Sequence, residues 1–447
     1  AAYNLALDCM ADDLIMQSQG NGWFWGDHCY NVKSNYTSSA FRSYDVWYAN
    51  YKWIANVNYI IDAEPEMAGT EADVAYVAGQ AYAIRALCYL NLATWFSRAP
   101  YNSLTGASRW NEPCVPVYTT GTSIDTGGQP RESLRTVYGR IDQDIDRAIE
   151  LLEKARETTL AENNKSHINL YVALGIKSRA CLAEGDWDGA FKAAKRVIDE
   201  GGYAVGTKSD LTSGMNSLDK QNVMWGAGIQ VADQAGGYAG FFTHMDNKEG
   251  AYAKSAPKLI SKQLYNRISA TDIRRDWWDP SDKESPYVSK KFSFANVASF
   301  LGDYIYMRVE EMYFTAAEAA LRLDDLKSAR ELMNTVMAER DPGYSANNRS
   351  GTLLGATTTT WTGSFLENIL THRRIELWGE YGRLFDVRRL GQGIDRRTDD
   401  GFSEECISMM NRRNVNITKA DTYDWVLTIP KAELDANPNI NEEDQNP

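Results

Sequence analysis

The chain has 447 residues, 43% of them hydrophobic, and a formal net charge of −13. It is long enough for a large core and for more than one compact unit. The acidic balance argues against nucleic-acid binding, which needs clustered Lys and Arg, and no stretch approaches the roughly 20 apolar residues of a membrane-spanning helix. With four histidines, and six cysteines without a CxxC pair, zinc-type ligand spacing is absent. The sequence predicts neither a metal nor a cofactor.

A segment rich in glycine and aromatic residues stands near the start of the chain, within a predicted loop over 20–43. It reads GNGWFWGDH from Gly20 to His28. The flanking glycines favour a loop, and three consecutive rings on a loop are not expected to share one core. Aromatic faces can cover the C–H face of a sugar, and neighbouring polar groups can bind its hydroxyls. The predicted ligand-binding residues here are Trp23, Phe24, Trp25, Asp27 and His28, with packing of one or two rings against the helices as the competing interpretation.

Helical periodicity begins next and predicts a first hairpin over 44–98. One stripe consists of Trp47, Tyr51, Ile54, Asn58 and Ile61, and another of Ala81, Ile84, Cys88, Leu92 and Trp95. A proline-rich loop is predicted over 99–131. Long loops of this kind in a compact protein are usually functional or disordered, and the aromatic content of this one argues against disorder.

A second hairpin region is predicted over 133–200. Gly185 and Asp186 should end one helix and cap the next, and the small Ala190 permits close helix approach. The phrase GDWDGAFKAAKRVID resembles the turn and second helix of a tetratricopeptide repeat. A third region, over 304–391, repeats this register, since Asp324-Asp325-Leu326 precedes Ala329 at the same spacing.

The stretch from 203 to 303 separates the second and third regions and has a different character. It is rich in Gly, Ser, Asp and aromatic residues, with a strand-like piece at 222–229, and is predicted to be an irregular ligand-binding subdomain. Its segment GGYAGFF offers Tyr238, Phe241 and Phe242 as further binding candidates, although core packing is an equal alternative. For Trp277 and Trp278, packing is the preferred interpretation.

Charged side chains gather on the helices of the third region and resemble a catalytic cluster. Their three- and four-residue spacings suit structural ion pairs instead. The set is Arg308, Glu311, Glu318, Arg373, Arg374, Glu376, Glu380, Arg383 and Asp386.

Six segments together resemble the SusD-like (RagB/SusD) family in the family's own order: 48–62, 81–101, 113–116 with 130–152, 308–323, 373–391 and 429–447. The strongest reads RRIELWGEYGRLFDVRRLG from Arg373, and the pattern departs from the family at His372 and Tyr381. The resemblance implies a mostly α fold, with tetratricopeptide-like hairpins as a scaffold, and one SusD-like unit over 1–447. It also implies binding aromatics in the loop that carries Trp23.

The same resemblance implies an outer-membrane lipoprotein that faces outward, captures glycan and caps a TonB-dependent porin of the SusC type, without catalysis. No GxSxG, HExxH, P-loop or strand-bound GxGxxG motif is present. Two alternatives stay open. One is an all-helical glycoside hydrolase with a Trp-lined cleft, because two suitably spaced carboxylates suffice. The other is a tetratricopeptide-like scaffold that binds peptides.

Overall fold

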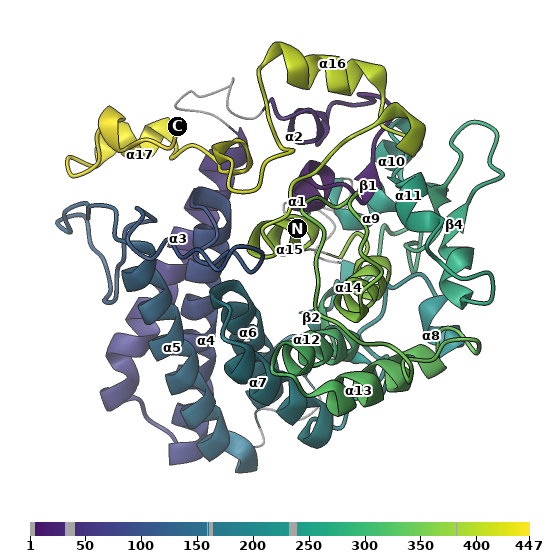
Figure 1. Cartoon of the computed structure of the whole chain (residues 1–447). Helices are drawn as coiled ribbons and strands as arrows, with labels where there is room; N and C mark the ends of the chain where they lie inside the picture. Colours follow the sequence, from purple (N-terminus) through teal and green to yellow (C-terminus); the bar gives the residue numbers. More distant parts are fainter. Residues whose placement is uncertain (1–4, 32–40, 159, 161–163, 232–238, 381) are drawn as a thin grey trace. The chain divides into compact units, whose positions relative to one another are not determined.

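The computed structural model describes the chain except for residues 1–4, 32–40, 159, 161–163, 232–238 and 381. The described chain is dominated by helices, with a few short strands (Figure 1). This confirms the predicted mostly α fold. No helix in the described part is long and apolar enough to cross a membrane.

The chain divides into two compact units. Unit 1 contains residues 1–31, 194–387 and 392–419, and unit 2 contains residues 32–193, 388–391 and 420–447. Each unit therefore assembles segments that lie far apart in the sequence. The predicted helical scaffold is shared between the two. Of the predicted irregular ligand-binding subdomain, the stretch 203–303 falls within unit 1, whereas the loop over 99–131 belongs to unit 2.

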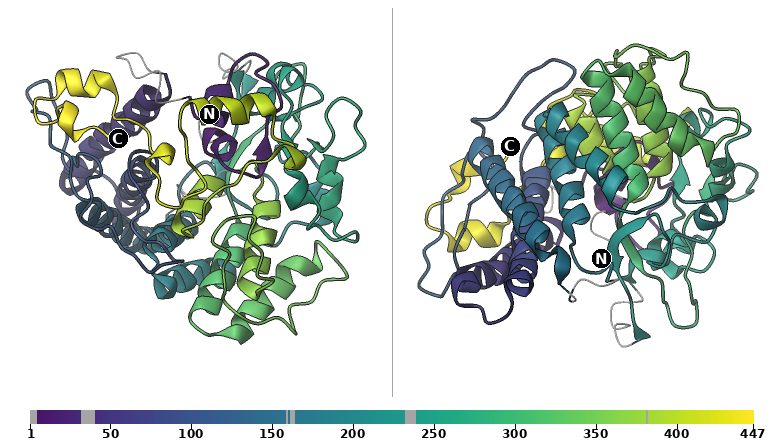
Figure 2. Two further views of the ribbon diagram at one scale, coloured as in Figure 1. Left: turned by 45° about the horizontal axis from the view of Figure 1, so that its top comes forward. Right: turned by 90° about the horizontal axis from the view of Figure 1, so that it is seen from below.

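Unit 2 is built on long helices that pack side by side (Figures 1 and 2). These are α3 (Phe41–Ala63), α4 (Glu71–Phe96), α5 (Leu134–Lys154), α6 (Leu170–Glu184) and the start of α7 (Trp187–Glu200), with the short α17 (Lys431–Ala436) near the C-terminus. Side chains cap several of them: Thr70, Ser133 and Asn169 accept hydrogen bonds from first-turn amides. Helices α3 and α4 fall over the predicted range 44–98, and α5, α6 and α7 over the predicted range 133–200.

Unit 1 combines one helical hairpin region with many short elements. Its helices are α1 (Leu5–Met10), α2 (Trp25–His28), α8 (Lys208–Leu211), α9 (Phe241–Met245), α10 (Ala251–Ser255), α11 (Lys262–Tyr265), α12 (Val309–Arg322), α13 (Leu326–Ala338), α14 (Phe365–Glu376), α15 (Arg383–Arg389, whose last two residues belong to unit 2) and α16 (Glu404–Arg412). Its strands are β1 (Leu14–Ile15), β2 (Val223–Ala227), β3 (Leu259–Ile260), β4 (Trp278–Asp279), β5 (Val288–Ser289) and β6 (Tyr304–Arg308). The order β1-β3-β5-β4 forms one small sheet, and β2 pairs antiparallel with β6. The strand predicted over 222–229 is thus confirmed as β2.

The two predicted helix turns have the same register. Gly185 ends α6 with φ of 77°, and the Asp186 carboxylate accepts from the Gly189 amide at 3.0 Å. In the second turn Asp324 has φ of 61°, and Asp325 accepts from the Ser328 amide at 3.0 Å. A positive φ suits glycine, so Asp324 adopts a conformation that few side chains tolerate.

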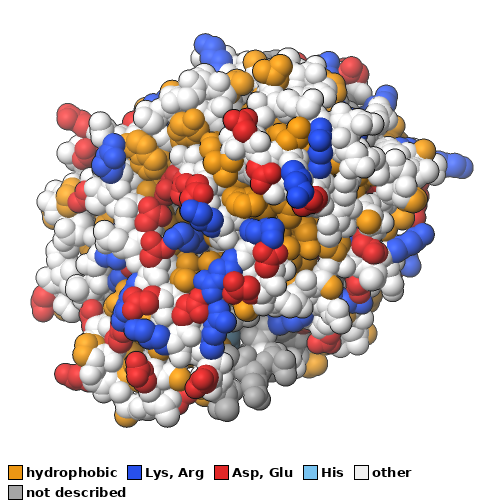
Figure 3. Space-filling view, turned by 60° about the horizontal axis from the view of Figure 1, so that its bottom comes forward, with side chains coloured by type: hydrophobic (Ala, Val, Ile, Leu, Met, Phe, Trp, Pro, Cys, Tyr) orange, Lys and Arg blue, Asp and Glu red, His pale blue; other side chains and the backbone are white. Residues whose placement is uncertain are grey.

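Ion pairs within and between helices cover the faces of α5 and α7. Lys154 pairs with Glu150 at 3.0 Å and Arg196 with Glu200 at 3.1 Å. The face shown in Figure 3 carries both charge signs interspersed. Exposed pairs of this kind add little to stability.

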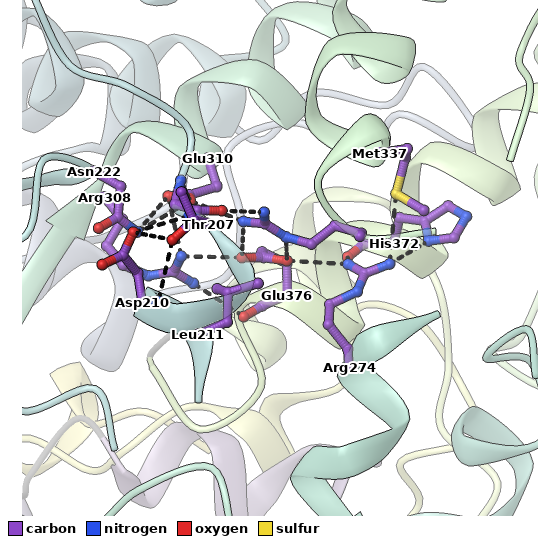
Figure 4. Close-up of polar contacts among 12 residues, drawn as sticks. Thr207, Asp210, Leu211, Asn222, Arg274, Arg308, Glu310, Met337, His372 and Glu376 are labelled. Carbon is purple, nitrogen blue, oxygen red and sulfur yellow. Dashed lines mark hydrogen bonds and ion pairs between the residues drawn. The ribbon is translucent and has the colours of Figure 1, made fainter. Parts of the chain in front are cut away.

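The buried charges of unit 1 form a different kind of network, centred on the Glu376 carboxylate (Figure 4). Arg308 and Arg340 donate to its Oε1 at 3.0 and 2.9 Å, and Arg274 donates to its Oε2 at 3.1 Å. Although burial opposes ionisation, these guanidinium groups hold the pKa of Glu376 well below its usual value. The side chains of all four residues are at most 1% exposed.

Neighbouring groups extend this network. Glu310 accepts from Arg340 at 2.8 Å, and Glu380 accepts from Arg308 at 2.7 Å and from Lys291 at 2.5 Å. Burial lowers the pKa of Lys291 to about 8. His372, where the sequence departs from the pattern it resembles, faces the Arg274 guanidinium at 2.9 Å. Burial together with that cation lowers the pKa of His372 well below its usual value.

The predicted structural role of the helix charges agrees with these contacts, but most partners are not on the same helix. Arg373 pairs with Asp386 at 2.9 Å, Arg374 with Asp12 at 3.2 Å, and Arg383 with Asp12 at 2.8 Å. Glu318 does pair four residues along, with Arg322 at 3.0 Å. The ion pairs therefore tie separate segments of unit 1 together.

Replacing Glu376 by Gln should lower the free energy of unfolding by about 3–5 kcal/mol, because it leaves buried guanidinium groups without their carboxylate. Denaturant titration followed by circular dichroism measures the loss. Glu331→Gln is the matched control, because that exposed carboxylate on α13 only approaches Lys327 at 3.9 Å; we expect about 0.5 kcal/mol or less. Equal midpoints for the two variants would contradict a structural role for the network.

Candidate functional site

The predicted sugar-binding loop is held in shape by backbone geometry that requires glycine. Gly20 and Gly22 have φ of 50° and 82°. A Cβ at Gly20 would lie 2.7 Å from both the Ser255 carbonyl oxygen and the Ala256 Cβ, so this loop lies directly against the end of α10. Phe24 also has a positive φ, of 59°, before α2 begins at Trp25. The loop predicted from the glycines is present, and it ends in one turn of helix.

Four aromatic rings meet where this loop contacts α9 and α10. The Trp23 ring centroid lies 5.3 Å from that of His244 and 5.7 Å from that of Tyr252. His244 stacks on Tyr252 at 4.8 Å with an interplanar angle of 12°, and Phe24 meets His244 edge-on at 5.0 Å. Phe24 and His244 are buried, whereas Trp23 and Tyr252 are only partly buried. Two ring surfaces thus remain accessible above a packed aromatic base.

Trp25, Asp27 and His28 do not take the positions predicted for ligand-binding side chains. Trp25 is 4% exposed, Asp27 3% and His28 0%. The His28 Nδ1 donates to the Cys9 carbonyl at 2.9 Å, and its ring stacks on Phe402 at 5.7 Å. With no accessible face or polar atom, these side chains support the loop from below. The competing interpretation, packing against the protein, applies to them and to Phe24.

The second predicted wall is also mostly buried. Phe242 is 2% exposed and packs against Phe294 and Tyr304, with ring centroids 5.7 and 6.0 Å away. Phe241 is partly buried and lines a cavity of about 60 Å³ beside Tyr304 and Phe292. That volume is far below the roughly 300 Å³ at which ligand pockets begin. Tyr238 lies outside the described residues, so its predicted role stays a prediction.

The α9 helix still reaches the loop, through a residue that the sequence prediction did not include. His244, three positions after Phe241, faces Trp23 and Phe24, while Phe242 faces the core. Helical spacing from Phe241 was the signal that could have indicated His244. Tyr252, on α10, had no comparable signal. Trp277 and Trp278 are buried at 2% and 1% exposure, which confirms their predicted packing role.

Unit 2 contains a larger aromatic groove, of about 490 Å³, that the sequence prediction missed. Helix α3, the loop over 118–126 and helix α17 form its walls. It is lined by Trp47, Tyr48, Tyr51, Lys52, Ile54, Ala55, Tyr118, Thr122, Ser123, Thr126, Pro430, Ala432 and Glu433. The stripe of Trp47, Tyr51 and Ile54 was identified as a packing face, but the contribution of Glu433, nearly 400 positions later, left no sequence signal. We call this site the α3 groove.

Two partly buried carboxyl groups with raised pKa values lie outside both aromatic sites. Burial, together with the Asp142 charge, raises the pKa of Glu184 to about 8, and burial raises that of Asp142 to about 6. Neither residue lines the α3 groove or contacts the rings around Trp23. Among the described residues, no group of three or more His, Cys, Asp or Glu is arranged to hold a metal ion. All six cysteines are buried free thiols, as predicted for Cys88 and Cys181.

Two family models match the chain and together cover most of it. Residues 248–447 match the model described as the SusD family, and residues 6–182 match one described as "Starch-binding associating with outer membrane". No curated protein sequence gives a match.

Several solved structures are similar to the chain over its whole length. A SusD-like carbohydrate binding protein from Bacteroides vulgatus is 25% identical, with a TM-score of 0.78 over 99% of this chain and 92% of that one. A SusD superfamily protein from Bacteroides thetaiotaomicron is 23% identical, with a TM-score of 0.80 over 100% and 94%. Surface glycan-binding protein A from Bacteroides thetaiotaomicron, solved in complex with laminarihexaose, is 16% identical, with a TM-score of 0.67 over 99% and 93%. By these matches in sequence and fold, the chain belongs to the SusD-like family.

Proposed function

We propose that this protein binds an oligosaccharide or polysaccharide at the bacterial outer-membrane surface and passes it, unhydrolysed, to a TonB-dependent porin of the SusC type. The accessible Trp23 ring beside Tyr252 is the observation that carries the glycan-binding part. Family membership supports it, since one similar structure is described as a carbohydrate binding protein and another holds laminarihexaose. The outer-membrane location draws on the description of the model that matches residues 6–182.

The chemistry of the rings around Trp23 suits a sugar. Sugars are strongly hydrated, so binding needs rigid apolar faces with a few placed polar groups. Trp23 offers a large face with few rotatable bonds, and contacts with His244 and Tyr252 fix its orientation. The polar groups predicted at Asp27 and His28 are buried. We therefore assign the hydroxyl contacts here to the Tyr252 phenol instead.

Replacing Trp23 by Ala should weaken glycan binding by about 2 kcal/mol or more, which is about thirtyfold in affinity. The glycan is first identified on an array, and its affinity is then measured by titration calorimetry. The circular dichroism spectrum should stay that of the wild type, because the ring is only partly buried in a loop.

Trp361→Ala is the control for this experiment. Trp361 belongs to the same unit, is 48% exposed and contacts the Arg267 guanidinium at 3.9 Å, but it is not among the rings around Trp23. We expect it to bind like the wild type. If Trp23→Ala also binds like the wild type, the rings around Trp23 are not the glycan site.

We also expect no glycan hydrolysis. A retaining or inverting glycosidase needs two carboxyl groups facing the scissile bond. Glu376, Glu380 and Asp386 are in ion pairs. Glu184, whose raised pKa keeps much of it protonated at neutral pH, is the best general-acid candidate by pKa alone. Its charged neighbours include Asp142, Asp186 and Asp146, and it does not line the α3 groove.

Incubating the bound glycan with the protein between pH 5 and 8 should release no new reducing ends. Glu184→Gln serves as the matched variant, and its background should equal that of the wild type. Turnover that disappears in Glu184→Gln would overturn this prediction and favour the glycoside hydrolase alternative.

The partner prediction calls for affinity purification of the natural, membrane-attached protein from detergent-solubilised outer membranes. A TonB-dependent barrel should co-purify in roughly stoichiometric amount, because delivery requires a stable complex. Mass spectrometry identifies the partner, and an unrelated outer-membrane lipoprotein carrying the same tag is the control. Recovery of cytoplasmic proteins alone would favour the peptide-binding scaffold.

A further inference from the structure

We propose that the α3 groove of unit 2 is a second carbohydrate-binding site, with residues distinct from those around Trp23. The inference rests on glycan binding as the protein's function and adds a second place for the same class of ligand. The groove volume of about 490 Å³ lies within the range of roughly 300–1,000 Å³ typical of small-ligand sites. A protein partner, in contrast, usually covers about 800 Å² of flatter surface.

The loop over 118–126 forms a fixed wall of the groove. Asn58 donates from Nδ2 to the carbonyls of Tyr118 and Thr120 at 3.2 and 2.9 Å. Arg85 donates to the Thr119 carbonyl at 2.9 Å and to the Asn58 side chain at 2.7 Å, and a bidentate contact with Asp144 at 2.7–2.8 Å orients it. Because these contacts order the wall before a ligand binds, binding does not incur the entropic cost of ordering it.

The opposite wall places a carboxylate at the groove. Glu433 on α17 accepts from the Trp47 indole Nε1 at 3.2 Å on one oxygen and from Asn437 Nδ2 at 2.8 Å on the other. Each carboxylate oxygen has two acceptor positions, so an oriented acceptor remains for a sugar hydroxyl. The Trp47 ring, 5% exposed, forms the floor beside Tyr51 at a centroid distance of 4.9 Å.

The rim of the α3 groove carries an apolar ring face and groups that can hydrogen-bond to sugar hydroxyls. Tyr48 is 51% exposed, an unusual position for a large ring, and Lys52 lies 5.8 Å from its centroid. Thr122, Ser123 and Thr126 add hydroxyl groups from the loop. Aromatic faces, one carboxylate, one ammonium group and several hydroxyls match the alternating C–H and O–H surfaces of a sugar chain better than they match a purely apolar ligand.

The test uses calorimetry with a panel of α- and β-linked hexaoses that includes laminarihexaose, on four proteins: wild type, Trp23→Ala, Tyr48→Ala and the double variant. Trp23→Ala should retain binding of at least one hexaose, and adding Tyr48→Ala should weaken that residual binding by about tenfold or more. Trp53→Ala is the matched control, since Trp53 is on the same helix and 56% exposed but does not line the groove. Hydrogen exchange of the bound state should show protection in peptides covering 44–60 and 116–128.

The outcomes separate the two sites. If Trp23→Ala abolishes all binding and only the peptides around residues 20–30 and 241–255 are protected, the α3 groove is not a glycan site, while the proposed function stands. If Tyr48→Ala alone abolishes binding and Trp23→Ala has no effect, the groove is confirmed and the site around Trp23 fails. If no hexaose binds, or if Tyr48→Ala instead loses a co-purifying barrel, the proposal for the groove is overturned.

Discussion

A buried carboxylate with several arginine partners is the constraint on which unit 1 depends. Glu376, at the end of α14, can stay ionised in the interior only while Arg274, Arg308 and Arg340 surround it. These arginines come from three other parts of the unit, before β4, at the end of β6 and after α13. These ion pairs therefore fix where β6, α13 and α14 meet. Apolar side-chain packing alone would specify that position less sharply. The pKa of Glu376 is lowered by the same arginine contacts.

Unit 2 uses the same physics for a different purpose. Arg85 and Asp144 are buried partners, and the remaining donor capacity of the arginine is directed at a loop carbonyl. The loop over 118–126 contains no regular structure of its own. The Arg85 contact, together with hydrogen bonds to Asn58, Tyr89 and Asp62, holds it as a defined wall. A core interaction thus determines a surface shape that can select a ligand.

The helices and their turns could be predicted from the sequence, because their signals are local. Asp186 and Asp325 cap helices through amides three residues away, so spacing alone reveals them. The direction of each ring in the loop over 20–28 could not be predicted. A loop has no period to assign faces. Trp25 packs against the His28 ring, and His28 in turn stacks on Phe402, which is distant in the sequence. The same reason explains why helix charges expected to pair along one helix, such as Arg383, pair instead with Asp12. Glu433 joins the α3 groove through a contact to Trp47 across 386 positions, which no local pattern encodes.

The interleaving of the two units has a consequence for the order in which the protein matures. Residues 5–31 belong to unit 1, yet Arg374 and Arg383, which hold Asp12 and Asp13, are made more than 350 residues later. Likewise the helices of unit 2 are complete long before Glu433 and Asn446, whose side chains bond to Trp47 and to the Phe96 carbonyl. At a synthesis rate of about 5–20 residues per second, the early segments remain for tens of seconds without the partners that cover their ionic and apolar surfaces. Vectorial synthesis therefore leaves these early segments without their native partners until residues 374–446 have been made.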